Sequence, residues 1–136
     1  NKDGKLKYKE MPEKFQAGFR NYVGLAGMES SITYLQNLGL DNIRKHIIKL
    51  SNLFIDEIGK MPESKIYVPE DESVRTSIVS FDIGKSNPET IVSELAKKGI
   101  IIAKREIMDK PILRISPHVF NTEDEILKVI EELKKL

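Results

Sequence analysis

The chain has 136 residues, of which 40% are hydrophobic and 32% are charged, the usage of an ordinary globular domain. Its 22 basic and 21 acidic residues leave a net charge of +1, so no positive excess points to nucleic acid or an anionic membrane surface, and no apolar run approaches the roughly 20 residues of a membrane span. Cysteine is absent, which excludes disulfides, thiolate metal sites and a cysteine nucleophile on these residues and is typical of a cytoplasmic protein.

The N-terminal part is predicted to be a linker followed by two helices. Residues 1–14 are polar, rich in lysine and interrupted by glycine and proline, which is typical of a linker. A first helix is expected from about Val23 to Gly39. A second begins at Asp41, its predicted N-cap, and closes at Pro62. Apolar residues recur at steps of three and four in both helices: Leu25, Met28, Ile32 and Leu35, then Ile43, Ile47, Leu50, Phe54 and Ile58.

Strands and a further helix are expected in the middle of the chain. Residues 65–68 form a short candidate strand, and residues 75–83 alternate as a longer strand should. The Asn-Pro pair at 87–88 predicts a helix start, and Gly99 predicts its end. Residues 100–104 are almost entirely apolar, which predicts a strand buried on both faces.

An arginine lies inside the last predicted strand, residues 112–116. Because side chains alternate along a strand, Leu113 and Ile115 point one way and Arg114 the other. A guanidinium held on a rigid element presents five fixed donors and suits bidentate capture of a carboxylate. The alternative is an ion pair with one of the many acidic side chains.

The order of elements predicts the fold class. A final helix follows the last strand, and Thr122 and Glu125 carry the signature of a capping box at its start. After the first two helices the order is therefore β-β-α-β-β-α, which predicts an α+β fold: a small, mostly antiparallel sheet with helices packed on one face, preceded by two helices. Ferredoxin-like domains share much of this order, so a ligand-sensing or interaction module without catalysis stays open.

Two segments resemble the class-V aminotransferases, the fold-type I pyridoxal-phosphate enzymes that include cysteine desulfurases and selenocysteine lyases. Residues 114–122 are similar to the end of that family, where an arginine is followed by Ser-Pro and then by Asn-Thr. Residues 15–27 look like the Phe-x-x-Gly-x-x-Asn segment with which the small domain of the family opens. The two segments bracket most of the chain at the separation that the family shows.

The resemblance implies a role for the whole chain. Residues 15–136 would be the small C-terminal domain of a pyridoxal-phosphate enzyme acting on amino acids, a homodimer, and residues 1–14 a linker from a large domain that precedes this sequence. That large domain holds the lysine that binds the cofactor, so no catalytic residue is expected here and the chain alone should be inactive. Arg114 would bind the α-carboxylate of the substrate, and the domain would supply part of the cleft wall and part of the dimer contact.

The resemblance also marks candidate cofactor contacts and departures from the family. Phe19 stands where the family usually has a threonine that donates to the cofactor phosphate, so Arg20 and Asn21 are the candidates for that contact, and a loop at an interface is the alternative. Residues 103–109 correspond to the loop of the persulfide-forming cysteine and contain none, which disfavours a desulfurase of that type and leaves an aminotransferase, lyase or epimerase. Lys104 and Arg105 are candidates for an anionic ligand, or else solvated charges.

The histidines give little support for catalysis or metal binding. His118 follows Arg114 closely and is a candidate for the same cleft, although a surface or capping role is the more common one. His46 is expected at the boundary of an amphipathic helix. Two histidines without metal-ligand spacing, and no cysteine, predict no metal site.

Overall fold

The computed structural model describes residue 4 and residues 6–16, 18–84 and 87–136. These residues belong to two compact units, Asn1–Gly39 and Leu40–Leu136. The predicted linker falls partly on residues 1–3 and 5, which lie outside the described residues. Its predicted boundary after residue 14 stays a prediction.

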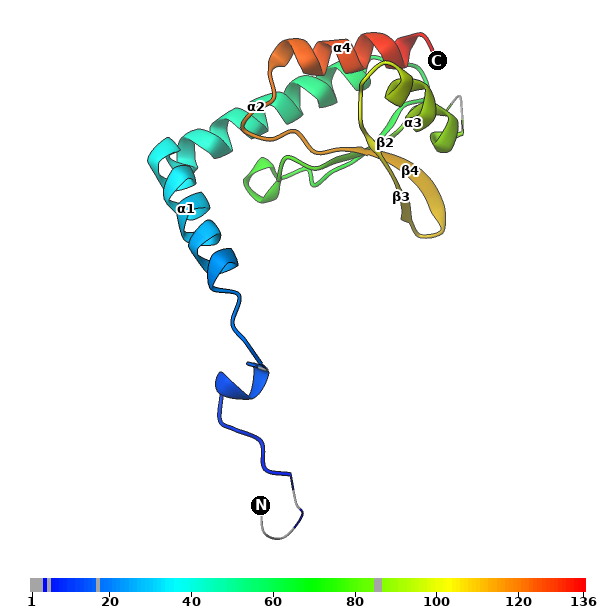
Figure 1. The fold of residues 1–136 in the computed structure, drawn as a ribbon. Coiled ribbons are helices and arrows are strands. Elements are labelled where there is room, and N and C mark those ends of the chain that lie inside the picture. The colour runs from blue at the N-terminus through cyan, green and yellow to red at the C-terminus, as the bar shows by residue number, and fades with distance from the viewer. Residues whose placement is uncertain (1–3, 5, 17, 85–86) are drawn as a thin grey trace. The chain divides into compact units, whose positions relative to one another are not determined.

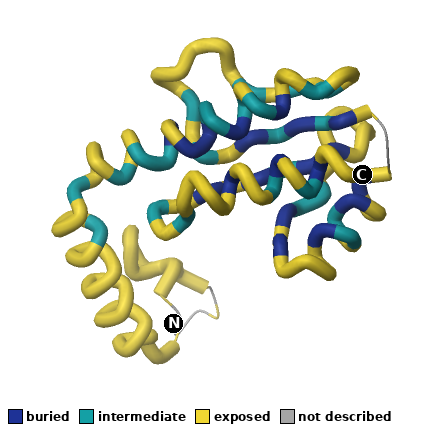
Figure 2. The backbone as a smooth tube through the Cα atoms, turned by 90° about the horizontal axis from the view of Figure 1, so that it is seen from above, coloured by how far each residue is buried: buried dark blue, intermediate teal, exposed yellow. Residues whose placement is uncertain are grey.

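The first unit consists of a short 3-10 helix, η1 (Glu13–Phe15), and the helix α1 (Tyr22–Leu38). Asn21 caps α1, because its side-chain oxygen accepts a hydrogen bond from the Gly24 N–H at 2.9 Å. Gly39 ends the helix with a φ of 83°, a left-handed conformation that favours glycine. The predicted helix is thus confirmed to within one residue, yet no residue of α1 is buried (Figure 2).

The second unit is an α+β domain, as predicted. Its elements in chain order are α2 (Leu40–Ile58), β1 (Lys65–Tyr67), the 3-10 helix η2 (Glu72–Val74), β2 (Val79–Asp82), α3 (Pro88–Lys97), β3 (Ala103–Ile107), β4 (Lys110–Ile115) and α4 (Glu123–Lys134). The four strands form one sheet in the order β1-β2-β4-β3, and every neighbouring pair is antiparallel. A loop with η2 joins β1 to β2, where a ferredoxin-like domain has a helix, whereas the run from β2 to α4 follows the β-α-β-β-α order of such a domain.

The core lies between the sheet and the helices α2, α3 and α4, which cover one face of it (Figure 1). Alternate residues of the strands point into this core and are almost fully buried: Val79, Phe81, Leu113 and Ile115. From α2, Phe54 meets Phe81 edge to face, with ring centroids 4.9 Å apart. The second and fourth strands alternate as the sequence predicted. The side chains between these core residues therefore point to the opposite face of the sheet.

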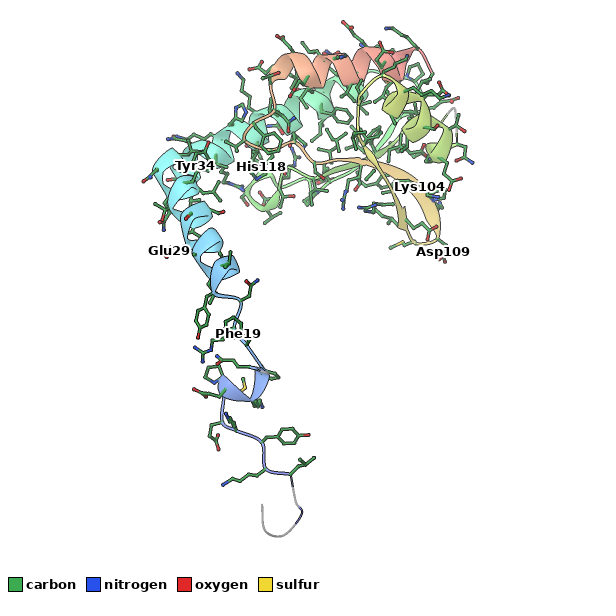
Figure 3. The ribbon with its side chains drawn as sticks, viewed as in Figure 1. Phe19, Glu29, Tyr34, Lys104, Asp109 and His118 are labelled. Carbon is green, nitrogen blue, oxygen red and sulfur yellow. The ribbon has the colours of Figure 1, made fainter. Side chains whose placement is uncertain are left out.

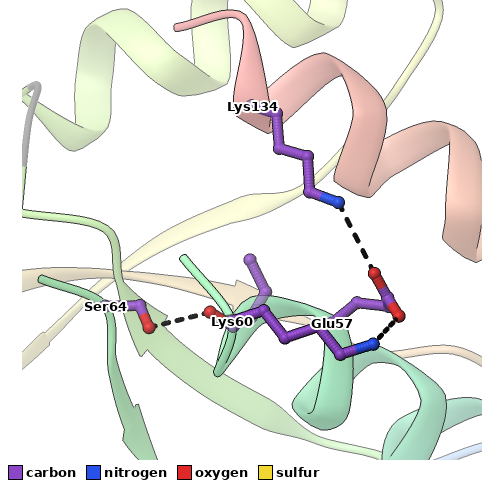
Figure 4. Close-up of polar contacts among 5 residues, drawn as sticks. Glu57, Lys60, Ser64 and Lys134 are labelled. Carbon is purple, nitrogen blue, oxygen red and sulfur yellow. Dashed lines mark hydrogen bonds and ion pairs between the residues drawn. The ribbon is translucent and has the colours of Figure 1, made fainter. Parts of the chain in front are cut away.

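Ion pairs tie the three helices to one another. Glu57 near the end of α2 lies between Lys60 and Lys134 of α4, and Lys134 Nζ is 3.5 Å from Glu57 Oε2 (Figure 4). These lysines, Lys60 above all, lower the pKa of Glu57. Lys98 at the end of α3 pairs with Glu132 of α4.

Three predictions about element ends, two in α2 and one in β2, were wrong. Asp41 lies in the first turn of α2, which begins at Leu40, and α2 ends at Ile58 rather than at Pro62. The second strand begins at Val79 instead of residue 75, because the preceding backbone is held by side chains rather than by a neighbouring strand. The Arg75 guanidinium donates to the carbonyls of Pro69 and Glu70, at 2.6 and 2.7 Å.

The third strand also differs from its prediction. It begins at Ala103 and not at residue 100, and Ile101 is 83% exposed, so the apolar run is not buried on both faces. Ile100 and Ile102 are buried before the strand starts. The turn to β4 is short, with Met108 and Asp109 at positive φ (49° and 62°), and Figure 3 shows Asp109 at the tip of this hairpin.

Candidate functional site

Arg114 lies on the sheet face that the helices of its unit do not cover. Its neighbours along β4, Leu113 and Ile115, point into the core, and its own side chain points to the opposite face, as predicted. In the register of the sheet it lies directly opposite Ser80 of β2 and Ala103 of β3. Both neighbours are small, so the guanidinium has room above the sheet. The sequence did not identify Ser80 or Ala103 as neighbours, because strand register cannot be read from one strand.

The guanidinium of Arg114 is partly buried and has no partner among the described residues. Its Nε atom is inaccessible to solvent and forms no hydrogen bond, the one such buried side-chain atom among the described residues. A buried donor without a partner costs about 1–3 kcal/mol. The predicted alternative, an ion pair with an acidic side chain, is absent for Arg114 among the residues that the structure describes.

The other arginines have different surroundings. Arg44 donates to the backbone carbonyls of Ser73, Glu72 and Arg75, the shortest at 2.8 Å. Arg20 donates to the Gln16 side chain. All ion pairs between described residues use lysine instead. Arg114 therefore differs from these arginines, because its strand fixes its position but its N–H groups have no acceptor among the described residues.

A hydrogen-bonded turn fixes the end of the strand that carries Arg114. Thr122 and Glu125 form the predicted capping box, with Thr122 N–H donating to Glu125 Oε2 at 3.0 Å. Asn121 donates to the same carboxylate oxygen at 3.0 Å, and its own side-chain oxygen accepts from the His118 N–H at 2.9 Å. The hydrogen bonds from Asn121 and Thr122 lower the pKa of Glu125, so the carboxylate is held in its charged form.

The two histidines take structural positions. The His46 Nε2 atom lies 3.0 Å from the Asn121 carbonyl oxygen, which ties α2 to this turn. His118 is exposed, and its ring lies 5.3 Å from the ring of Phe120. Figure 3 labels His118 near the turn before α4. No group of three potential metal ligands occurs among the described residues.

A small cavity of about 110 Å³ lies between the end of β4 and α4. Ser116, Asn121 and Glu125 contribute polar groups to its wall, and Ile115 and Ile126 contribute apolar ones. Because Ile115 points to the helix side of the sheet, the cavity lies on the face away from Arg114.

The strand alternation separates Lys104 from Arg105, which the sequence had grouped as candidates for an anionic ligand. Lys104 lies opposite Leu113, on the helix face, and forms an ion pair with Glu89 of α3 that lowers the pKa of Glu89. Arg105 lies opposite Ile112, on the same face as Arg114. Of these two residues, only Arg105 therefore shares a face with Arg114, which is predicted to bind the substrate carboxylate.

The candidate cofactor contacts lie in the first unit, before α1. Arg20 and Asn21 line an open hollow of about 560 Å³ together with the exposed Phe19. The Asn21 side-chain oxygen is engaged as the cap of α1, which leaves its amide N–H groups as donors. Figure 3 labels Phe19 in the segment that leads into α1.

Among the described residues, no helix is both long enough and apolar enough to span a lipid bilayer.

Comparison with known proteins gives a consistent family. The model of the family described as Aminotransferase class-V matches residues 3–129. A probable cysteine desulfurase of Halalkalibacterium halodurans is 26% identical, over 94% of this chain and 33% of that protein. A probable cysteine desulfurase of Pyrococcus abyssi is 29% identical, over 95% of this chain and 35% of that protein. The chain thus spans about a third of the length of these relatives.

Solved structures show the same fold. The apo cysteine desulfurase of Thermococcus onnurineus NA1 superposes with a TM-score of 0.85 at 23% identity, over 95% of this chain and 34% of that one. The cystine C-S lyase C-DES, in complex with its reaction product cysteine persulfide, superposes with a TM-score of 0.75 at 20% identity, over 98% of this chain and 34% of that one. With a family model that matches nearly the whole chain, these findings show that the chain belongs to the class-V aminotransferase family.

Proposed function

We propose that residues 15–136 are the small C-terminal domain of a pyridoxal-phosphate enzyme that acts on amino acids, and that residues 1–14 are the linker from its large domain. The family membership and the one-third coverage of the relatives support this proposal. The complete protein would be a cytoplasmic homodimer. The chain has 17 lysines, but none lies in the sequence setting of the lysine that binds the cofactor, so the chain alone is expected to be inactive.

Arg114 is the proposed ligand of the substrate α-carboxylate. The observation that carries this assignment is its buried Nε without a partner, on the open face of a rigid strand. A carboxylate can accept from the two terminal nitrogens of the guanidinium together, and this bidentate pair would give Arg114 the partner that the described residues do not supply. By fixing the carboxylate, Arg114 would orient the bonds at the α-carbon relative to the cofactor.

The cofactor is proposed to be held mainly by the large domain. Pyridoxal phosphate, when bound, supplies the electron sink for breaking bonds at the α-carbon of the amino acid. Arg20 fits a phosphate contact, because its guanidinium is exposed and bonds one side chain, that of Gln16. Asn21 fits less well, since its oxygen already caps α1 and its amide group remains as the donor.

The proposed reaction is an aminotransferase, lyase or epimerase reaction. The relatives named above carry the name cysteine desulfurase, and cysteine is absent from this chain. A sulfur-transfer step through a thiol of this domain is therefore impossible. The hairpin of β3 and β4, where the resemblance placed such a thiol, carries charged and apolar side chains instead.

The test is the Arg114→Ala variant of the complete protein. We expect kcat/KM for the amino-acid substrate to fall roughly 30- to 1,000-fold, because a charge-assisted pair is lost. This fall corresponds to a loss of about 2–4 kcal/mol of transition-state stabilisation. The Arg44→Ala variant is the matched control, since Arg44 bonds backbone carbonyls of the β1–β2 loop, and it should keep its kcat/KM. An unchanged kcat/KM for Arg114→Ala in a folded protein would reject the assignment.

A further inference from the structure

The face of the sheet that carries Arg114 holds a second guanidinium on the neighbouring strand. We propose that the amino-acid substrate has an acidic side chain, and that Arg105 binds its second carboxylate while Arg114 binds the α-carboxylate. This inference rests on the proposed function of Arg114 and adds the substrate class to it. Arg105 is thereby a specificity-determining residue, and Arg114 the common anchor.

The strand register brings the two arginines to neighbouring positions. Arg114 lies opposite Ala103, and Arg105 lies two residues further along β3, opposite Ile112. Such diagonal neighbours on one face of an antiparallel pair are about 7–8 Å apart, within reach of long side chains. Ala103, which lies opposite Arg114 and precedes Arg105 on this face of β3, has only a methyl group and leaves space above the strand. Ile112, which is 2% exposed, forms the floor beside it.

The charge of this face is strongly one-sided. Its cationic residues, as placed by the register, come from three strands: Lys65, Arg105, Lys110 and Arg114. None of them forms an ion pair with a described residue, whereas Lys104 on the opposite face is paired with Glu89. The acidic residue on this face, Asp82, accepts a hydrogen bond from the Gly84 N–H at 2.9 Å. Four cations against one engaged carboxylate favour a ligand with more than one negative charge.

Arg105 is free to take such a ligand. Its side chain is exposed, and the one hydrogen bond that it forms within the described part of the chain joins Nη1 to the backbone carbonyl of Lys104 at 2.8 Å. If the Arg105 side chain turned towards the open face, it would exchange this hydrogen bond for a charge-assisted bidentate pair with a carboxylate. The bidentate pair is the stronger of the two interactions. A solvated charge on an edge strand is the ordinary alternative, and it predicts no preference among ligands.

The experiment measures binding to the cofactor-loaded complete protein by calorimetry, with pairs of ligands that differ in charge but hardly in shape. L-aspartate is compared with L-asparagine, and L-glutamate with L-glutamine. We expect at least one acid to bind about tenfold or more tightly than its amide. In Arg105→Gln this preference should disappear through weaker binding of the acid, with the amide unaffected. Lys104→Gln, which removes the same charge from the other face of the same strand, should keep the preference.

The outcomes separate the two proposals. In Arg114→Gln, acid and amide should both bind about tenfold or more weakly, because both share the α-carboxylate. If Arg114→Gln weakens both ligands but Arg105→Gln leaves the preference intact, the inference about Arg105 is overturned and the role of Arg114 stands. If Arg114→Gln changes neither ligand, the proposed function itself fails. Failure of both acids to bind better than their amides in the unmodified protein would also overturn the acidic-substrate inference.

Discussion

Arg114 does not stabilise the fold of the free domain. Its Nε is buried and unpaired, so the residue should lower the stability of the free domain by an amount on the order of 1–3 kcal/mol. Functional sites are where such local costs are expected, which supports the proposal that Arg114 binds a ligand. The cost of Arg114 in the free domain can be measured.

The corresponding prediction concerns stability rather than activity. Replacing Arg114 by Met keeps most of the apolar stem and removes the unpaired donor, so the free energy of unfolding should stay the same or rise by up to about 2 kcal/mol. Urea unfolding of the chain, followed by circular dichroism, measures this change. A loss of more than about 1 kcal/mol in Arg114→Met would mean that the guanidinium has a stabilising partner in solution.

Some residue roles could be predicted because their signals are local. The capping box of Thr122 and Glu125 and the helix end before Gly99 each depend on a few adjacent residues, and the structure confirms them. A short connection at Met108 and Asp109 follows from the sequence, but the positive φ of Met108 could not be predicted, because methionine does not favour that conformation. The pairing of β3 with β4 determines this turn.

Among the elements, α3 and α4 are joined by a charged contact with a pH dependence. Glu132 accepts from Lys135 and from Lys98, and these two hydrogen bonds lower its pKa from the ordinary value of 4.5 to about 2. A carboxylate whose pKa is lower in the folded state stabilises the fold above the unfolded-state pKa. Its contribution should therefore be complete above about pH 4.5 and should be lost as the pH falls towards 2.

We predict that Glu132→Gln flattens part of this acid dependence. The melting temperature of the variant should be lower than that of the unmodified chain at pH 6, and the difference should shrink between about pH 4.5 and pH 2. Thermal unfolding at several pH values measures both effects. Glu131→Gln is the control, because Glu131 forms no ion pair with a described residue. An equal difference at pH 6 and pH 2 would show that charge on Glu132 does not matter.

Element ends were the weakest part of the sequence prediction, for a physical reason. Residues 75–78 have strand-forming composition, yet Arg75 and Arg44 bond the backbone carbonyls of the loop before β2. These contacts join residues up to 31 positions apart, so no local pattern reports them. The same limit applies to Lys104 and Arg105, whose separation onto two faces depended on where β3 begins.

At the scale of the whole molecule, the two units differ in how they are stabilised. The core lies entirely within Leu40–Leu136, and no residue of α1 is buried. A 17-residue helix without tertiary packing is only marginally stable in water. The apolar side chains of α1, such as Leu25 and Ile32, are therefore expected to be poorly protected in the isolated chain.

We predict that the isolated 136-residue chain shows fast amide hydrogen exchange in α1 and slow exchange in β2, β4 and α4. The same preparation should neither bind pyridoxal phosphate stably nor turn over amino acids. Exchange measured by mass spectrometry tests the first part, and visible absorption after dialysis with the cofactor tests the second. Protection of α1 equal to that of α4, or turnover by the isolated chain, would contradict the assignment as a domain that needs its large partner.

The candidate site was predictable in part at this scale. The strand alternation alone identified the face of Arg114, and the structure confirms it. Arg20 and Asn21 lie in the other unit, and their proposed role follows from the resemblance rather than from the alternation of a strand.

The alternation of β4 has a consequence for how such an enzyme can change. Leu113 and Ile115 belong to the core, while Arg114 and its neighbours across the sheet contribute nothing to it. Substitutions on one face therefore test folding, and substitutions on the other test ligand choice, with little interference between them. If Arg105 has the role proposed for it, a lineage could exchange the residue at position 105 and acquire a new substrate without changing its core, so new chemistry could arise on an unchanged scaffold.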